Sequence, residues 1–265
     1  NVFSKVLYAN RDILDRTGSD ALALQRYKAQ IVRCLDNPDI SIRRRALDVI
    51  SALIDQDNAE RLVPQILKYL HLADAEFRME LVGRIFAAIQ RFSPNEQWNF
   101  DAILQILRES GGYVRTDIIS AVCGVVSRSK AMQTYAVNKL EGIISESSTI
   151  QPLVQVSAWI LGEYGEPSDT INQTFSQILA LPQTTKETKA YILTAMAKLS
   201  SRSSAQQPFI LTTLSNEMKD NDLDLQQRSG EFLQILTKTQ AGESLLAPAP
   251  PVEEDLDDEN QHKGQ

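Results

Sequence analysis

The sequence predicts an all-α protein of the HEAT or armadillo type, in which two-helix hairpins stack into a solenoid. Apolar residues recur at the three-and-four spacing of a helix along most of the 265 residues. Similar helices recur every 34–40 residues, and no stretch shows the alternation of a convincing strand. Aromatic residues make up only 6% of the chain and glycines number only 11, which disfavours a β-sandwich.

The repeat is visible in alternate helices, whose first turns can be aligned. Equivalent positions fall at Ile42, Phe77, Val114, Val154, Thr188 and Leu225. The steps between them are 35, 37, 40, 34 and 37 residues, each long enough for one pair of helices. A single hairpin cannot bury its apolar face alone, so stacked neighbours are needed to form a continuous core.

In the first half of the chain, each expected helix carries one apolar face. In order, these are Val2–Ala9, a helix capped by Ser19 that runs to Leu35, a helix that ends at Ile54, Asn58–Leu72, Asp74–Phe92, and a helix opened by Ser93 and Pro94. Residues 36–39 (Asp-Asn-Pro-Asp) predict a turn between the second and third of them. Two glycines at 111–112 are expected to end the last.

The second half continues the same pattern. Its expected helices are Val114–Val126, Ala131–Ile144, Gln151–Gly165, Ile171–Leu181, Thr185–Leu199, Pro208–Met218 and Leu223–Leu236. In the third of these, Pro152 suits a first helical turn, because its missing N–H would be unpaired there anyway. One face is expected to be buried, at Leu153, Val154, Ser157, Ala158 and Leu161. Gly162 and Gly165 are expected to let the chain leave the helix.

The helical pattern stops at Thr239, so we expect a solenoid over residues 1–238 and a disordered Pro-rich acidic linker over 239–265. Of 34 acids and 27 bases, the linker holds seven acids and one base, which leaves 27 acids against 26 bases in the solenoid. This near-neutral body argues against nucleic acid as a partner. Leu245 and Leu246 hint at a sorting-type dileucine, but an acid only two residues ahead rather than four favours a linker.

Two cysteines, Cys34 and Cys123, lie in apolar helical patterns and are expected to be small core residues. They make no disulfide framework, which favours a reducing, intracellular compartment. No segment reaches the roughly 20 apolar residues of a membrane span, and the chain opens on helical pattern rather than a signal peptide. Because the first residue is Asn1 rather than Met, we expect a fragment of a longer array.

Nothing in the sequence predicts an enzyme, a cofactor or a metal site. The two histidines, His71 and His262, fall at a helix end and in the linker, and two Cys with two His at wide separations lack zinc-ligand spacing. No phosphate loop, dinucleotide fingerprint or nucleophile elbow is found. The function is therefore expected to be a binding or scaffold function.

The densest basic cluster is Arg43, Arg44 and Arg45. One hypothesis is a contact for an acidic lipid headgroup, a phosphate or a partner carboxylate. The alternative is a solvated helix turn that pairs with Asp39 and Asp48 and stacks an arginine between repeats. The two tryptophans, Trp98 and Trp159, fall at apolar helical positions, which favours packing in the core.

Several segments resemble the large subunits of clathrin adaptor complexes, the adaptins. They are residues 31–46 (IVRCLDNPDISIRRRA), 112–117 (GYVRTD), 151–165 (QPLVQVSAWILGEYG), 191–200 (YILTAMAKLS) and 226–229 (QQRS). Their order and spacing match as well, over most of residues 1–238, and residues 159–165 favour the gamma kind over the alpha or epsilon kinds. The resemblance implies the later half of an adaptin trunk and the start of its hinge.

What the resemblance implies is a non-enzymatic scaffold subunit of a heterotetramer that sorts cargo into clathrin-coated vesicles. The implied site of action is the cytoplasmic side of trans-Golgi network and endosomal membranes, with peripheral membrane contact. The implied partners are a beta-adaptin, a medium subunit and a small subunit, with clathrin reached indirectly and a small GTPase reached through the early trunk. The alternatives are another adaptor large subunit of alpha or epsilon type, or a HEAT-repeat scaffold of nuclear transport or phosphatase assembly.

Overall fold

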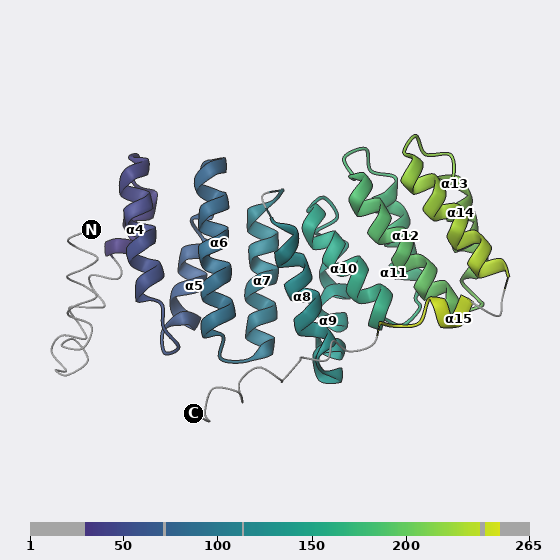
Figure 1. The fold of residues 1–265 in the computed structure, drawn as a ribbon, viewed down its shortest axis with the longest axis horizontal. Helices are drawn as coiled ribbons and strands as arrows, with labels where there is room; N and C mark the ends of the chain where they lie inside the picture. The colour runs from purple at the N-terminus through teal and green to yellow at the C-terminus, as the bar shows by residue number, and fades with distance from the viewer. Residues whose placement is uncertain (1–29, 71–72, 113, 239–241, 250–265) are drawn as a thin grey trace, which may run out of the picture. The chain divides into compact units, whose positions relative to one another are not determined.

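The computed structural model describes residues 30–70, 73–112, 114–238 and 242–249. These residues form helices joined by short connections, and no strand is found among them (Figure 1). The expected helix Val2–Ala9 and the start of the helix capped by Ser19 lie outside the described residues, as do His71 and His262.

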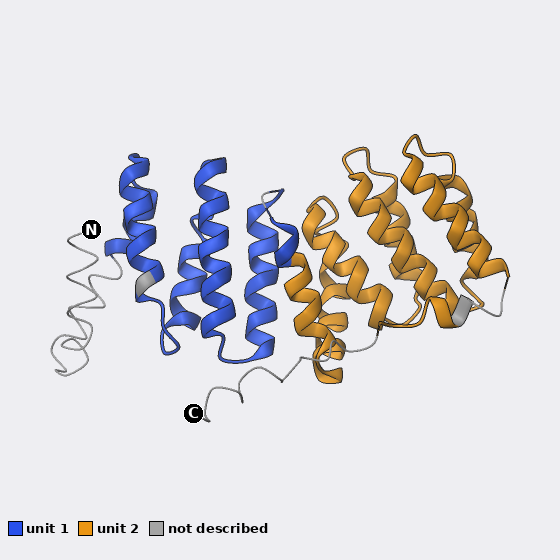
Figure 2. Ribbon diagram, in the orientation of Figure 1, with its two compact units in different colours: residues 1–118 blue, residues 119–265 orange. Residues whose placement is uncertain are grey.

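Residues 1–118 form one compact unit (Figure 2). Its described elements are η1 (Cys34–Asp36), α4 (Ile40–Leu53), α5 (Ala59–Leu67), α6 (Ala75–Phe92) and α7 (Glu96–Ser110). Alternate helices lie side by side, α4 against α6 and α5 against α7, and α6 also packs against α5 and α7. The unit is therefore built of two rows of helices, as helical hairpins stacked in register require.

Residues 119–265 form the second unit (Figure 2). Its described elements are α8 (Thr116–Ser127, from residue 119 onward), α9 (Lys130–Ile143), α10 (Gln151–Tyr164), α11 (Asp169–Leu179), α12 (Lys186–Ser201), α13 (Gln207–Glu217), α14 (Leu223–Thr237) and α15 (Gly242–Leu245). One row consists of α10, α12 and α14, packed in that order. Their hairpin partners α9, α11 and α13 pack against α10, α12 and α14 respectively, and α13 also packs against α12.

The predicted solenoid class is confirmed, and so is most of the predicted repeat. Four of the aligned positions lie in the first turns of α6, α10, α12 and α14 and are at most 1% exposed: Phe77, Val154, Thr188 and Leu225. Val114 lies just before α8, and Ile42 is 41% exposed in α4. The aligned positions therefore mark the start of each repeat. Ile42 differs from the four buried positions because its side chain is exposed.

Six of the described helices begin at a polar side chain that accepts a main-chain N–H of the first turn. These caps are Asp39, Asp74, Asn95, Ser129, Thr185 and Asp222. The helix α7 was expected to open at Ser93 and Pro94, but its cap is Asn95, whose Oδ1 accepts the N–H of Trp98 at 2.8 Å. It ends at Gly111 with φ of 61°, a left-handed conformation that favours glycine.

Helix α10 is buried on nearly every side, where the sequence predicted a single buried face. Val156, Ile160 and Glu163 are buried in addition to the expected positions, because α10 packs against both α9 and α12. The expectation that Gly162 lets the chain leave the helix is wrong, because this residue lies inside α10. A Cβ at Gly162 would lie 2.7 Å from the Cα of Ala195 on α12, so the glycine permits a close helix crossing.

Four residues expected in the core are only partly buried. Trp98 and Trp159 are of intermediate exposure, and so are the free thiols Cys34 and Cys123. Each lies at an apolar helical position that borders a surface rather than the interior. Burial raises the pKa of the Cys123 thiol to about 12, with the charge of Glu163 acting in the same direction, so this thiol stays protonated at neutral pH.

The segment expected as a linker contains a short ordered stretch. Residues 242–249 are described; they include α15, and Leu246 is only 5% exposed. This differs from the expectation of no packed structure after Thr239, because Leu246 is buried and charged side chains of α10 and α12 bind the main chain of Ala247 and Ala249. The boundary at residue 238 stays a prediction.

Candidate functional site

The described part of the chain contains no group of three or more His, Cys, Asp or Glu side chains that could hold a metal ion. No helix in it is long and apolar enough to cross a membrane. Two surfaces are candidate sites, one on each unit: the arginine cluster of α4 and a groove along α10, α12 and α14.

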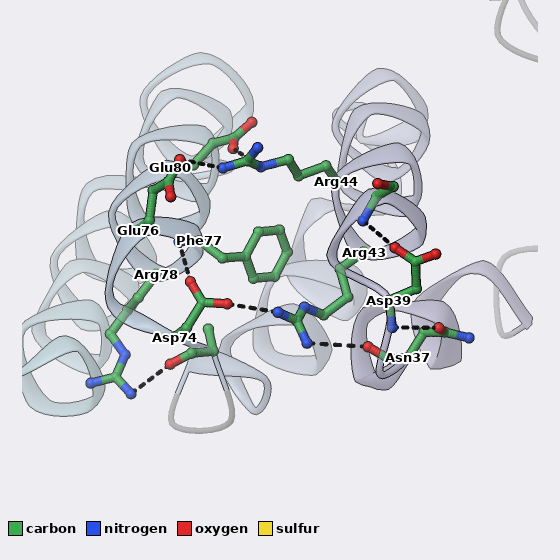
Figure 3. Close-up of polar contacts among 11 residues, drawn as sticks. Asn37, Asp39, Arg43, Arg44, Asp74, Glu76, Phe77, Arg78 and Glu80 are labelled. Atoms are coloured by element: carbon green, nitrogen blue, oxygen red, sulfur yellow. Dashed lines mark hydrogen bonds and ion pairs between the residues drawn. The ribbon is translucent and has the colours of Figure 1, made fainter.

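Arg43 joins α4 to the start of α6 (Figure 3). Its Nη2 lies 2.6 Å from Oδ2 of Asp74, and its Nη1 donates to the carbonyl oxygen of Asn37 at 3.2 Å. The guanidinium also stands 5.4 Å from the ring centroid of Phe77, within range of a cation–π contact. The N–H of Phe77 and the charge of Arg43 hold the pKa of Asp74 below its usual value. The expected stacking of an arginine between repeats is thus seen at Arg43.

Arg44 pairs with two glutamates of α6, Glu76 at 2.5 Å and Glu80 at 3.4 Å (Figure 3). The hydrogen bond and charge of Glu76 raise the pKa of this guanidinium. Arg45 is exposed and forms no ion pair with the described part of the chain. A contact of this cluster with an acidic partner or lipid stays a prediction.

The carboxylates expected to pair with this cluster have other roles. Asp39 accepts the N–H of Ser41 as the cap of α4, at 2.8 Å. Asp48 pairs at 3.0 Å with Arg84 of α6. The expected partners within α4 are therefore replaced by partners one repeat later.

We expect Arg43→Ala to lower the free energy of unfolding of the first unit by about 1–2 kcal/mol, because the mostly buried guanidinium makes charge-assisted hydrogen bonds. Urea unfolding followed by hydrogen exchange of α4 and α6 measures this. The matched control is Arg45→Ala, an exposed neighbour expected to change the value by no more than about 0.5 kcal/mol. Equal losses in the two variants would contradict a structural role specific to Arg43.

The second surface is a groove of about 510 Å³ along the row of α10, α12 and α14. Apolar and small side chains form its floor, among them Ala158, Ala190 and Ala195. Charged side chains of both signs line its rim: Glu163, Lys186, Glu187, Lys198, Asp222, Asp224 and Arg228. Such a groove suits a peptide segment better than a nucleic acid, because its charges nearly balance.

One end of this row is fastened by an ion-pair cluster. Lys189 of α12 lies 2.5 Å from Asp220 and 3.4 Å from Glu217, and all three side chains are at most 20% exposed. The hydrogen bond from Lys189 lowers the pKa of Asp220. Burial alone would lower the pKa of Lys189, but the hydrogen bonds and charges of Asp220 and Glu217 outweigh it and raise that pKa.

The directions of these pKa shifts predict how the stabilisation depends on pH. The depressed pKa of Asp220 means that its contribution is fully present above the unfolded-state value of about 3.9 and is lost as pH falls through the folded value. The raised pKa of Lys189 means that its contribution is lost only in strong alkali. Asp220→Asn should therefore cost about 1–2 kcal/mol at pH 7 and less at pH 2, as measured by urea unfolding at both pH values.

The control for this pH experiment is Asp224→Asn, because Asp224 is 69% exposed and its ion pair among the described residues is with Arg228 of its own helix. It should cost no more than about 0.5 kcal/mol at either pH. A loss in Asp220→Asn that stayed the same from pH 7 to pH 2 would show that the ion pair is not its cause.

Beside the groove lies a smaller pocket of about 250 Å³ with aromatic walls. Trp159, Tyr164 and Tyr191 line it, and Trp159 meets Tyr164 edge to face with ring centroids 5.8 Å apart. Cys123 and Ala249 also line this pocket. Burial raises the pKa of both tyrosines, so the pocket presents neutral aromatic side chains.

Sequence reasoning missed the buried ion pair of Glu163 on α10 with Lys198 on α12. The signal that could have found it is the repeat itself. The two residues are 35 positions apart, as close to one repeat as Asp48 and Arg84, which are 36 apart. Opposite charges separated by one repeat length are therefore candidates for contacts between neighbouring helices of one row.

Residues 12–240 match the family model described as the adaptin N terminal region. The chain belongs to the adaptin family. The family resemblance predicted from the sequence is thereby confirmed.

Within the adaptin family, the chain is similar to gamma subunits. AP-1 complex subunit gamma of Dictyostelium discoideum is 32% identical over 98% of this chain and 31% of its own length. AP-1 complex subunit gamma-1 of Arabidopsis thaliana is 30% identical over 88% of this chain and 28% of its own length. AP-2 complex subunit alpha-1 of Arabidopsis thaliana is also similar, at 31% over 87% of this chain and 24% of its own length. The chain spans about a third or less of the length of these relatives.

Proposed function

We propose that the chain is part of the large-subunit scaffold of a clathrin adaptor complex of the AP-1 type. The match of residues 12–240 to the adaptin N terminal region, with AP-1 gamma subunits among the most similar relatives, carries the proposal. Its role is non-enzymatic. The stacked hairpins of each unit offer a row of helices on which protein partners bury surface. Affinity then comes from a few desolvated anchors.

The proposed partners are a beta-adaptin, a medium subunit and a small subunit, with clathrin engaged indirectly. A small GTPase acts through the early trunk of the full subunit. The complex works on the cytoplasmic side of trans-Golgi network and endosomal membranes, bound peripherally, and supports the loading of cargo into clathrin-coated vesicles. The exposed guanidinium of Arg45, beside Arg43 and Arg44, is the proposed contact for an acidic partner or lipid headgroup.

A second candidate is the large alpha subunit of an AP-2 complex. The similarity to AP-2 complex subunit alpha-1, 31% over 87% of the chain, favours it specifically. The fold and the solenoid rows are the same for both candidates, so the partners that assemble with the chain distinguish them.

Co-purification of the chain from cytosol of its own source, followed by identification of the bound proteins, tests the proposal. Recovery of a beta-adaptin with a medium and a small subunit is the expected result, and the AP-1 or AP-2 type of the medium subunit decides between the two candidates. Recovery of an importin cargo, a phosphatase catalytic subunit or RNA in place of adaptor subunits would overturn the proposal.

A further inference from the structure

The segment after the last long helix of the second unit is seated on α10 and α12. Leu246 is 5% exposed, whereas its neighbour Leu245 is 64% exposed. One leucine is thus an anchor in the unit and the other faces solvent. The chain continues from this anchor as Ala247, Pro248 and Ala249.

Two main-chain groups of the segment are bound by charged side chains. Nζ of Lys198 donates to the carbonyl oxygen of Ala247 at 3.4 Å. The N–H of Ala249 donates to Oε2 of Glu163 at 3.0 Å. These two groups flank Pro248, which has no N–H of its own and so leaves no donor unpaired between them.

The receiving side chains are also held by contacts that do not involve the segment. Glu163 and Lys198 form an ion pair through Oε1 of the glutamate, and their side chains are 5% and 15% exposed. Arg202 holds the end of α10 by donating from Nη1 to the carbonyl oxygen of Glu163 at 2.9 Å. The second carboxylate oxygen, Oε2, receives its hydrogen bond from the segment, so removal of the segment leaves a buried acceptor in need of a main-chain N–H.

The aromatic pocket lies at the end of this path. Ala249 forms part of its wall beside Trp159, Tyr164 and Tyr191. Aromatic-lined grooves recognise extended proline-containing peptides, because such peptides are already ordered before they bind. The sequence beyond Ala249 continues with Pro250 and Pro251.

We propose that Glu163, Lys198 and the aromatic pocket form a binding site for extended proline-containing peptides, and that Leu246–Ala249 of the same chain is its resident ligand. Glu163 accepts the N–H after the proline, and Lys198 donates to the carbonyl before it. Leu246 supplies the apolar anchor. A second peptide of this kind binds only when the resident segment has left. The resident segment therefore competes with other peptides for the site.

The test uses a fluorescent peptide with the sequence of Ser244–Pro251 and measures its binding by polarisation. In the full chain with Leu246→Asp and Ala249→Pro, the resident segment loses its anchor and its N–H, and the peptide is expected to bind at least ten-fold more tightly than to the unaltered chain. The matched control is Leu245→Asp, a change at the exposed neighbour, which should leave binding as weak as in the unaltered chain.

Adding Glu163→Gln to the displaced chain should remove peptide binding, because glutamine has one acceptor oxygen for two donors, Nζ of Lys198 and the peptide N–H. A peptide with proline in place of Ala249 should also fail to bind to the displaced chain. This measurement changes only the peptide, so it does not depend on the folding of a further protein variant. The proposal is overturned if the peptide binds equally to the unaltered and displaced chains, if it binds neither, or if it still binds after Glu163→Gln in a chain whose helical content is unchanged.

Discussion

Gly162→Val will lower the free energy of unfolding of the second unit by about 3 kcal/mol, near the upper end for overpacked sites. The new Cβ would lie 2.7 Å from Cα and 2.9 Å from Cβ of Ala195. Because Cα belongs to the main chain of α12, the contact cannot be relieved by a side-chain rotation. Helices α10 and α12 must separate, and the apolar surface buried between them is partly lost. Urea unfolding and hydrogen exchange of the α10 and α12 amides measure the effect.

Gly142→Val is the matched control, since the same side chain is added at another helical glycine of the same unit. A Cβ at Gly142 has nothing within 4 Å, and glycine is the weaker helix former, so the variant should be unchanged or more stable by up to about 0.5 kcal/mol. If both variants lost the same free energy, the loss would not depend on the close crossing with Ala195, and the role assigned to Gly162 would be wrong.

The close crossing also shows where sequence reasoning stops. The periodicity of residues 151–165 predicted a helix and its first turn correctly, because spacing and the proline at position 152 act locally. The meaning of Gly162 depends on Ala195, which lies in the next repeat. From the sequence alone, a glycine near a helix end predicts the end of the helix, because the helix that crosses it is not known.

The ion pairs of the arginine cluster also depend on residues of the next repeat. From the sequence, the nearest carboxylates to Arg43 and Arg44 are those of their own helix and turn. In the structure Asp39 is engaged as a helix cap, and the carboxylates that face the cluster are Asp74 and Glu76, one repeat later. Local pairing was predictable only where the partner belonged to the same turn. Contacts between neighbouring repeats of one row depend on the register of the repeats.

Phe77→Ala will lower the free energy of unfolding of the first unit by about 3–5 kcal/mol, the largest effect expected in this unit. The ring is fully buried at 0% exposure, so its removal leaves a cavity between α4 and α6. The loss includes the cation–π contact with Arg43, worth about 0.5–1 kcal/mol at a partly exposed site. Urea unfolding reports the total, and hydrogen exchange should show the loss concentrated in α4 and α6.

The control is Met79→Ala on the same helix, two residues further along, where the side chain is 57% exposed. Alanine is the better helix former, so this variant should stay within about 0.5 kcal/mol of the unaltered chain. Combining Phe77→Ala with Arg43→Ala should cost less than the sum of the two single changes, because both remove the same cation–π contact. Strict additivity would mean that ring and guanidinium stabilise the repeat independently, and that α4 and α6 are held together at this point by two separate contacts.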